Sequence, residues 1–360
     1  MTTSIQRVIK KTKEVILKVP KKISLHIALM VTTNDRKNYA SMARSNGISY
    51  AKVCIRKDQV KERIDDSARF LISLIKRLST KKNPGYLVAD FTILNKPFSE
   101  NIPSVTYDYD GVGKLVSKGF SAGFIFWSNG PITIPFDYTL WHREKDVGEL
   151  YKKKTELVKE IIKLARENEI PFDEIKLDGA FASQDMLEFF VRENIHFTLR
   201  IPSNRVITTK DGNYQLSKHP GLKLQRNQKY KTIFASYKGT YCYFTVHKRN
   251  GTKNTKEVVF IVSDIYRSAK KHVDSYAKRW VAEKFFRTGK QYIGLTDCQS
   301  TNADKQRLHL FSVMISYAVL QLMRIDKKKQ SVEEVLHCVR RQKMVDDLFG
   351  YIDLERTFMC

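Results

Sequence analysis

The stretch YAKRWVAEKFFRTGK, residues 276–290, carries the most informative spacing in this chain. One tyrosine, two cations and one carboxylate stand in it at offsets 0, 3, 7 and 14: Tyr276, Arg279, Glu283 and Lys290. At about 100° per residue, an α-helix would place these four side chains within an arc of roughly 60°. Apolar residues of the segment 269–292 cover the neighbouring arc, so we expect a helix that is buried on one side. From spacing alone, a solvated charged surface would explain the polar side equally well.

The elements upstream predict an α/β fold around a central sheet. Apolar runs and helical periodicity predict, in chain order, strands 85–92, 121–127 and 132–138, helix 146–169, strand 174–178, helix 183–194 and strand 196–201. Three strands, a helix, a strand, a helix, a strand and a later helix follow the ribonuclease-H-like order. We therefore expect a ribonuclease-H-like core at 83–202 and 266–326, in which acidic residues of the first strand, the fourth strand and the final helix share one site.

A basic, β-rich insertion is predicted at 203–265, before the final helix of that core. Strands are expected at 230–235, 240–246 and 257–262, with aromatic residues interleaved among Lys and Arg. Such strands could stack bases, although β-sheets are rich in aromatic residues for packing reasons alone. A buried helix at 303–325 and a C-terminal helical segment, 327–360, complete the chain; the segment includes a charged helix at 331–348.

The N-terminal residues 1–82 predict a helical DNA-binding domain. Within 38–53, Ala43 allows close helix contact, Gly47 makes a turn and Val53 seats a second helix, so this stretch resembles a helix-turn-helix. An amphipathic helix is expected at 58–78, and the run KKNPG at 81–85 predicts the domain boundary.

Positive charge is concentrated in two blocks. The formal net charge is +26; residues 1–82 hold 20 Lys and Arg against 6 Asp and Glu, and residues 203–265 hold 12 against 3. Two basic blocks around a near-neutral body indicate a nucleic-acid partner. A membrane surface or a lysine-rich proteome would give similar totals.

Cysteine and hydropathy patterns argue against other classes of protein. The five cysteines are scattered without C-x-x-C or zinc spacing, which indicates a reduced cytoplasm. No signal peptide is evident, and the apolar stretch 308–323 is short and contains polar residues, so we expect a core helix and no membrane partner.

Asp90 and Asp178 each follow an apolar strand, YLVA and IKL respectively. Each aspartate alone could simply cap a turn. Together with Glu283 they predict three converging carboxylates, which can hold two divalent cations about 3.5–4 Å apart for displacement at phosphorus. Mg²⁺ suits such oxygen ligands.

With these residues in place, the chain resembles the DDE transposases of bacterial insertion sequences, in the group that carries Y-x2-R-x3-E-x6-K (insertion-sequence family four). Residues 276–290 match that pattern in full, while DFT at 90–92 and DGAF at 178–181 match the group's aspartate regions more loosely. The resemblance covers about residues 85–325.

The resemblance implies a catalytic, metal-binding triad of Asp90, Asp178 and Glu283 with two Mg²⁺, which Mn²⁺ can replace. It implies that Tyr276, Arg279 and Lys290 bind DNA, and that the protein cuts and rejoins double-stranded DNA at terminal inverted repeats. A homodimer bridging two ends, in the bacterial cytoplasm on DNA, is the implied assembly.

Two alternatives stay open at this point. One is a DNA-binding relative with an inactive or repurposed catalytic domain, and the other is a ribonuclease-H-like nuclease without strand transfer. Some members of the group also form a DNA hairpin, using a tryptophan in the insertion. Residues 203–265 contain no tryptophan, so the resemblance assigns no hairpin step.

Overall fold

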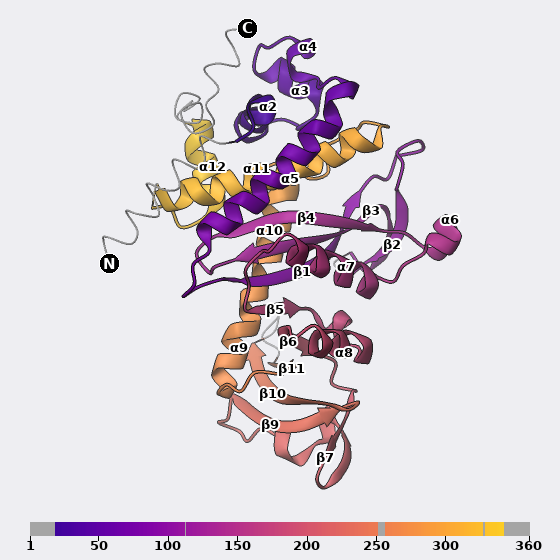
Figure 1. Ribbon diagram of the computed structural model, residues 1–360, viewed down its shortest axis with the longest axis vertical. Coiled ribbons are helices and arrows are strands. Elements are labelled where there is room, and N and C mark those ends of the chain that lie inside the picture. Colours follow the sequence, from indigo (N-terminus) through magenta and orange to yellow (C-terminus); the bar gives the residue numbers. More distant parts are fainter. Residues whose placement is uncertain (1–18, 112, 251–255, 327, 342–360) are drawn as a thin grey trace.

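The computed structural model describes residues 19–341 except 112, 251–255 and 327. Within that part of the chain, eleven strands form one mixed sheet in the order β2-β3-β1-β5-β6-β11-β10-β9-β7-β8, with β4 paired to β3 (Figure 1). The strands are β1 (Tyr86–Asn95), β2 (Thr106–Asp110), β3 (Leu115–Ser128), β4 (Thr133–Trp141), β5 (Glu174–Leu177), β6 (His196–Ile201), β7 (Val206–Thr209), β8 (Gly212–Gln215), β9 (Tyr230–Tyr237), β10 (Thr240–Asn250) and β11 (Lys256–Ser263).

Helices flank this sheet and precede it. They are α2 (Lys21–Thr32), α3 (Tyr39–Ser45), α4 (Tyr50–Val53), α5 (Val60–Leu78), α6 (Glu144–Val147), α7 (Lys154–Glu167), α8 (Gln184–Arg192), α9 (Ala269–Ala277), α10 (Val281–Gln291), α11 (Ala303–Asp326) and α12 (Val332–Arg341). Short 3₁₀ turns are η1 (Lys57–Gln59), η2 (Gly148–Leu150), η3 (Gly179–Phe181), η4 (Leu216–Lys218), η5 (Pro220–Leu222) and η7 (Lys278–Trp280). The α/β class predicted from the sequence is confirmed.

The strands that follow one another in the core pair in two ways. β1 runs antiparallel to β3, which runs antiparallel to β4. On its other side β1 runs parallel to β5, and β5 runs parallel to β6. The parallel pairs require long crossovers, and helices α7 and α8 occur in those connections.

The two faces of the core sheet carry different helices. Asp90 and Phe124 are partners in register, and the Phe124 ring lies 5.3 Å from that of Phe285 on α10. Phe91, which follows Asp90 on β1, points to the opposite face of the sheet. There the Nζ atom of Lys154, at the start of α7, lies 5.3 Å from the centre of the Phe91 ring. Asp90 therefore shares the face that α10 covers.

Two predicted elements differ from the structure. The expected helix 146–169 begins only at Lys154, because Gly148 has a φ of 55° that interrupts the preceding turn. The connection between Asp90 and the next expected strand contains β2, which pairs with an N-terminal extension of β3. Strand periodicity missed β2 because it is short and half exposed.

The insertion continues the core sheet. β11 runs antiparallel to β6, and β10 and β9 add to it in turn. The three strands expected in 203–265 are present, and β7 and β8 form a further hairpin that the sequence did not predict. Figure 1 shows α9 rising along these strands to α10.

The N-terminal helices pack on the rest of the fold. One hydrophobic core runs from Val19 to Val339, and α5 lies against α11 and β4. α3 and α4 are joined by a turn at Gly47, whose φ is +63°, and Ala43 and Val53 are buried as expected. α4 is a single turn.

Helix α11 is long and apolar enough to cross a membrane by composition, but 89% of its apolar window is buried inside the protein. It is the expected core helix. The predicted helix 331–348 is observed as α12, and its residues beyond Arg341 lie outside the described part of the chain.

Candidate active site

The two aspartates lie level on neighbouring strands. β1 pairs in parallel with β5 so that Val88 lies opposite Lys176; two residues later come Asp90, still on β1, and Asp178, directly after the end of β5. Asp178 occupies the N-cap position of η3 directly after β5, but its side chain makes no capping hydrogen bond there. Asp90, in contrast, lies within β1, which continues to Asn95. It is partly buried, and no turn explains its carboxylate.

The predicted single helix 269–292 consists of α9 and α10 joined by the 3₁₀ turn η7. Tyr276 lies at the end of α9, Arg279 in η7 and Glu283 in the first turn of α10. A 3₁₀ turn is tighter than an α-helical one. The segment from α9 to α10 therefore stays helical, but the rotation per residue about the helix axis changes in η7, which contains Arg279.

Hydrogen bonds join these side chains to both aspartates. Arg279 Nη1 donates to Asp90 Oδ2 at 2.7 Å, and Nη2 donates to Glu283 Oε1 at 2.5 Å. Arg279 Nε donates to Tyr276 Oη at 3.2 Å, and that hydroxyl donates to Asp178 Oδ1 at 3.1 Å. Five of the six predicted site residues thus form one cluster, with Arg279 at its centre.

The cluster is sheltered, and its charges perturb one another. Burial, reinforced by the charges of Glu283 and Asp178, raises the pKa of Asp90 to about 6 although Arg279 opposes the shift. Burial also raises the pKa of Tyr276 well above its ordinary value. Its hydroxyl therefore stays protonated and remains a donor to Asp178.

Lys290 is the sixth predicted residue, and it stands apart from the cluster. It is exposed near the end of α10, two turns beyond Glu283, and the charge of Asp110 at the end of β2 acts on it. Helical spacing places Lys290 on the same side of α10 as Glu283, but it gives no distance from the sheet.

The carboxylates suit a divalent metal ion in their chemistry. Glu283 Oε2 is buried and has no hydrogen-bond partner in the structure, which is costly unless a ligand satisfies it. Oxygen-only donors are those that Mg²⁺ prefers. Among the described residues, however, no three His, Cys, Asp or Glu side chains are already grouped closely enough to hold an ion. Arg279 lies between two of the carboxylates.

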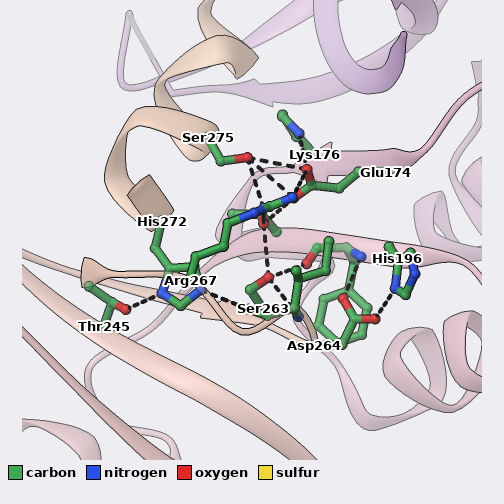
Figure 2. Close-up of polar contacts among 12 residues, drawn as sticks. Glu174, Lys176, His196, Thr245, Ser263, Asp264, Arg267, His272 and Ser275 are labelled. Atoms are coloured by element: carbon green, nitrogen blue, oxygen red, sulfur yellow. Dashed lines mark hydrogen bonds and ion pairs between the residues drawn. The ribbon is translucent and has the colours of Figure 1, made fainter. Parts of the chain in front are cut away.

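Sequence reasoning missed a second polar cluster, which anchors α9 to the sheet (Figure 2). At its centre the carboxylate of Glu174, on β5, accepts a bidentate pair from Arg267 at 2.9 and 3.0 Å. Lys176 Nζ lies 2.7 Å from the same carboxylate. The available signal was the pair of charged residues inside the buried strand EIKL, since buried charges occur mainly as pairs.

The same cluster reaches the insertion. His272 on α9 donates from Nε2 to the carbonyl of Ile265 at 2.9 Å, since a carbonyl can only accept. Burial lowers the pKa of His272, so its neutral Nδ1 accepts from the hydroxyl of Thr245 on β10 at 2.8 Å. Strands of the core and of the insertion therefore both hold α9.

Comparison with known proteins places this site in context. Residues 152–319 match the family described as a transposase DDE domain. A probable transposase for insertion sequence element IS5377 of Geobacillus stearothermophilus is 26% identical over 158 residues, or 43% of this chain and 40% of that protein. The match thus spans less than half of the relative. Both similarities support a DDE transposase; the family match includes Asp178 and Glu283 and begins after Asp90.

Proposed function

We propose that this chain is the transposase of a bacterial insertion sequence, of the group that carries Y-x2-R-x3-E-x6-K, with a ribonuclease-H-like catalytic core. The observation that carries the proposal is the convergence of Tyr276, Arg279 and Glu283 with Asp90 and Asp178 in one hydrogen-bonded cluster. The antiparallel β1-β3-β4 unit next to the parallel strands β5 and β6 supports the core assignment.

In this proposal Asp90, Asp178 and Glu283 hold two Mg²⁺, for which Mn²⁺ can substitute. When bound, the cations supply an activated nucleophile and stabilise the leaving oxygen during cleavage and strand transfer. Tyr276 orients Asp178 by donating to Oδ1, leaving the other carboxylate oxygen to a ligand. Arg279 offsets the repulsion among the carboxylates, which would otherwise favour protonation of Asp90.

The substrate in this proposal is double-stranded DNA carrying terminal inverted repeats, with target DNA as the acceptor. Residues 1–82 and the insertion supply most of the net positive charge of the chain, which would attract phosphates. Lys290 is exposed on the side of α10 that carries Glu283, where it is available to a phosphate. A homodimer bridging two ends in the bacterial cytoplasm completes the proposal.

The test is cleavage of DNA that carries the sequences flanking this gene, with Mg²⁺ or Mn²⁺ present. Asp90→Asn, Asp178→Asn and Glu283→Gln are each expected to lower cleavage at least 10³-fold while DNA affinity stays within a few-fold. Glu188→Gln is a matched control, because Glu188 is an exposed carboxylate on α8 that accepts a hydrogen bond from Gln184.

The outcomes separate the alternatives. Cleavage by Glu283→Gln at the wild-type rate would refute the triad. Binding without cleavage by the wild-type protein would favour an inactive relative, and cut products without joined products would favour a nuclease.

A further inference from the structure

In the part of the chain that the structure describes, the Glu174 carboxylate is the most heavily bonded acidic group outside the candidate active site, and Figure 2 shows its contacts. The residue is 5% exposed, and it receives hydrogen bonds or ion pairs from four side chains: Arg267, Lys176, Thr198 and Ser275. A buried carboxylate is tolerated only when such donors satisfy it. The hydrogen bonds and ion pairs of Glu174 do not include the five clustered site residues, so the proposed chemistry does not use its carboxylate.

Two of the four donors to Glu174 lie at opposite ends of α9. Arg267 lies in the loop just before Ala269, where the helix begins, and Ser275 lies in the last turn of the helix. Ser275 Oγ donates to Glu174 at 3.3 Å and immediately precedes Tyr276. The contacts therefore fix α9 at two points along its length.

The carboxylate that accepts these hydrogen bonds lies on β5, the strand that directly precedes Asp178. Glu174 begins β5, and Asp178 follows directly after that strand ends. A strand of four paired residues is a rigid spacer. The separation between Tyr276 Oη and Asp178 Oδ1, 3.1 Å, thus depends on where Glu174 holds α9.

The chemistry of the Glu174–Arg267 ion pair suits the positioning of α9 better than the stabilisation of the fold. A bidentate guanidinium–carboxylate contact fixes orientation as well as distance, because two parallel hydrogen bonds must align. A buried ion pair gives little net stability compared with apolar side chains of the same volume, since both charges lose their hydration. Arg267 also contacts Ser275 Oγ at 3.3 Å, so it joins both fixed points of α9.

We infer that Glu174 and Arg267 are positioning residues. They fix the position of α9 relative to Asp178 and, through α9, the positions of Tyr276, Arg279 and Glu283. The catalytic consequence rests on the proposed function. The structural consequence does not, because it concerns only where α9 lies on β5.

Arg267→Lys tests the inference, since it keeps the charge and removes the bidentate geometry. Arg143→Lys is the matched control: Arg143 also makes a two-bond contact with a carboxylate, that of Asp146, far from α9 in sequence. Hydrogen exchange of backbone amides is measured in both variants, and single-turnover cleavage and DNA affinity are measured alongside.

We expect Arg267→Lys to raise exchange of the α9 amides about tenfold while amides of α7 stay unchanged. Cleavage should slow about tenfold or more with the dissociation constant for DNA within twofold, and Arg143→Lys should change neither. Unchanged exchange in α9, or an equal rise in α7, would overturn the positioning role, as would cleavage equal to that of Arg143→Lys. A wild-type protein that does not cleave would refute the proposed function instead, and the exchange measurement would still decide whether the pair positions α9.

Discussion

Replacing Glu174 by glutamine should destabilise the fold strongly. Burial alone would raise the pKa of this carboxyl, but Arg267, Lys176 and Thr198 outweigh it and lower the pKa from 4.5 to about 2. A shift of that size corresponds to about 3 kcal/mol of stability at neutral pH. Glutamine would leave the buried Lys176 and the partly buried Arg267 facing a neutral amide, and breaking a buried ion pair in this way typically costs about 3–5 kcal/mol. We therefore expect Glu174→Gln to lose about 3 kcal/mol of unfolding free energy.

The measurement is unfolding in urea at pH 7 and at a series of lower pH values. Because the folded pKa of Glu174 is depressed, its contribution is present above the unfolded pKa near 4.5 and is lost as pH falls towards 2. The difference between wild type and Glu174→Gln should therefore be largest above pH 4.5 and shrink below it. Taking this difference removes the effect of the other carboxyls, which titrate in both proteins.

Glu169→Gln is the control, because Glu169 pairs with Lys76 at 3.0 Å on the surface with its side chain 84% exposed. It should lose no more than about 1 kcal/mol. Equal losses in the two variants, or a difference from wild type that does not depend on pH between 4.5 and 2, would refute the reasoning.

Three further results are expected. Tyr276→Phe should slow cleavage about tenfold with little change in DNA affinity, because it removes the hydroxyl that holds Asp178; an unchanged rate in single-turnover assays would contradict this. Gly123→Ala should destabilise the fold by about 2 kcal/mol or more, as seen by thermal unfolding, since a Cβ there would lie 2.5 Å from the Phe91 ring; a stability equal to wild type would show that the ring can move. Neutralising three lysines in 1–82 should reduce the slope of log affinity against log salt by up to about 3, and an unchanged slope would mean that these charges do not meet phosphates.

Local sequence predicted most elements of the fold. The apolar strands around Val88 and Ile175 and the helix 60–78 appear close to their expected limits, because their periodicity reflects burial against one core. The helix expected from residue 146 was partly wrong because one glycine adopts a positive φ. β2 was missed because it has only five residues and is half exposed, although its partner on β3 follows it closely in the chain.

The sequence selected the candidate site residues but did not indicate how they would be arranged. Spacing on one helix placed Tyr276, Arg279 and Glu283 together, and the strand patterns selected Asp90 and Asp178. No pattern indicated that Arg279 would bridge the carboxylates, since that contact joins residues 189 positions apart.

The sequence by itself therefore determined which side chains share a face of a helix or the end of a strand, because those relations follow from backbone periodicity. Only the tertiary structure decided which faces meet. The register of β1 on β5 brings the aspartates level, and the buried Glu174–Arg267 pair holds the helix against them. Long-range pairing and burial of charge depend on the packing of the whole core, which local periodicity does not encode.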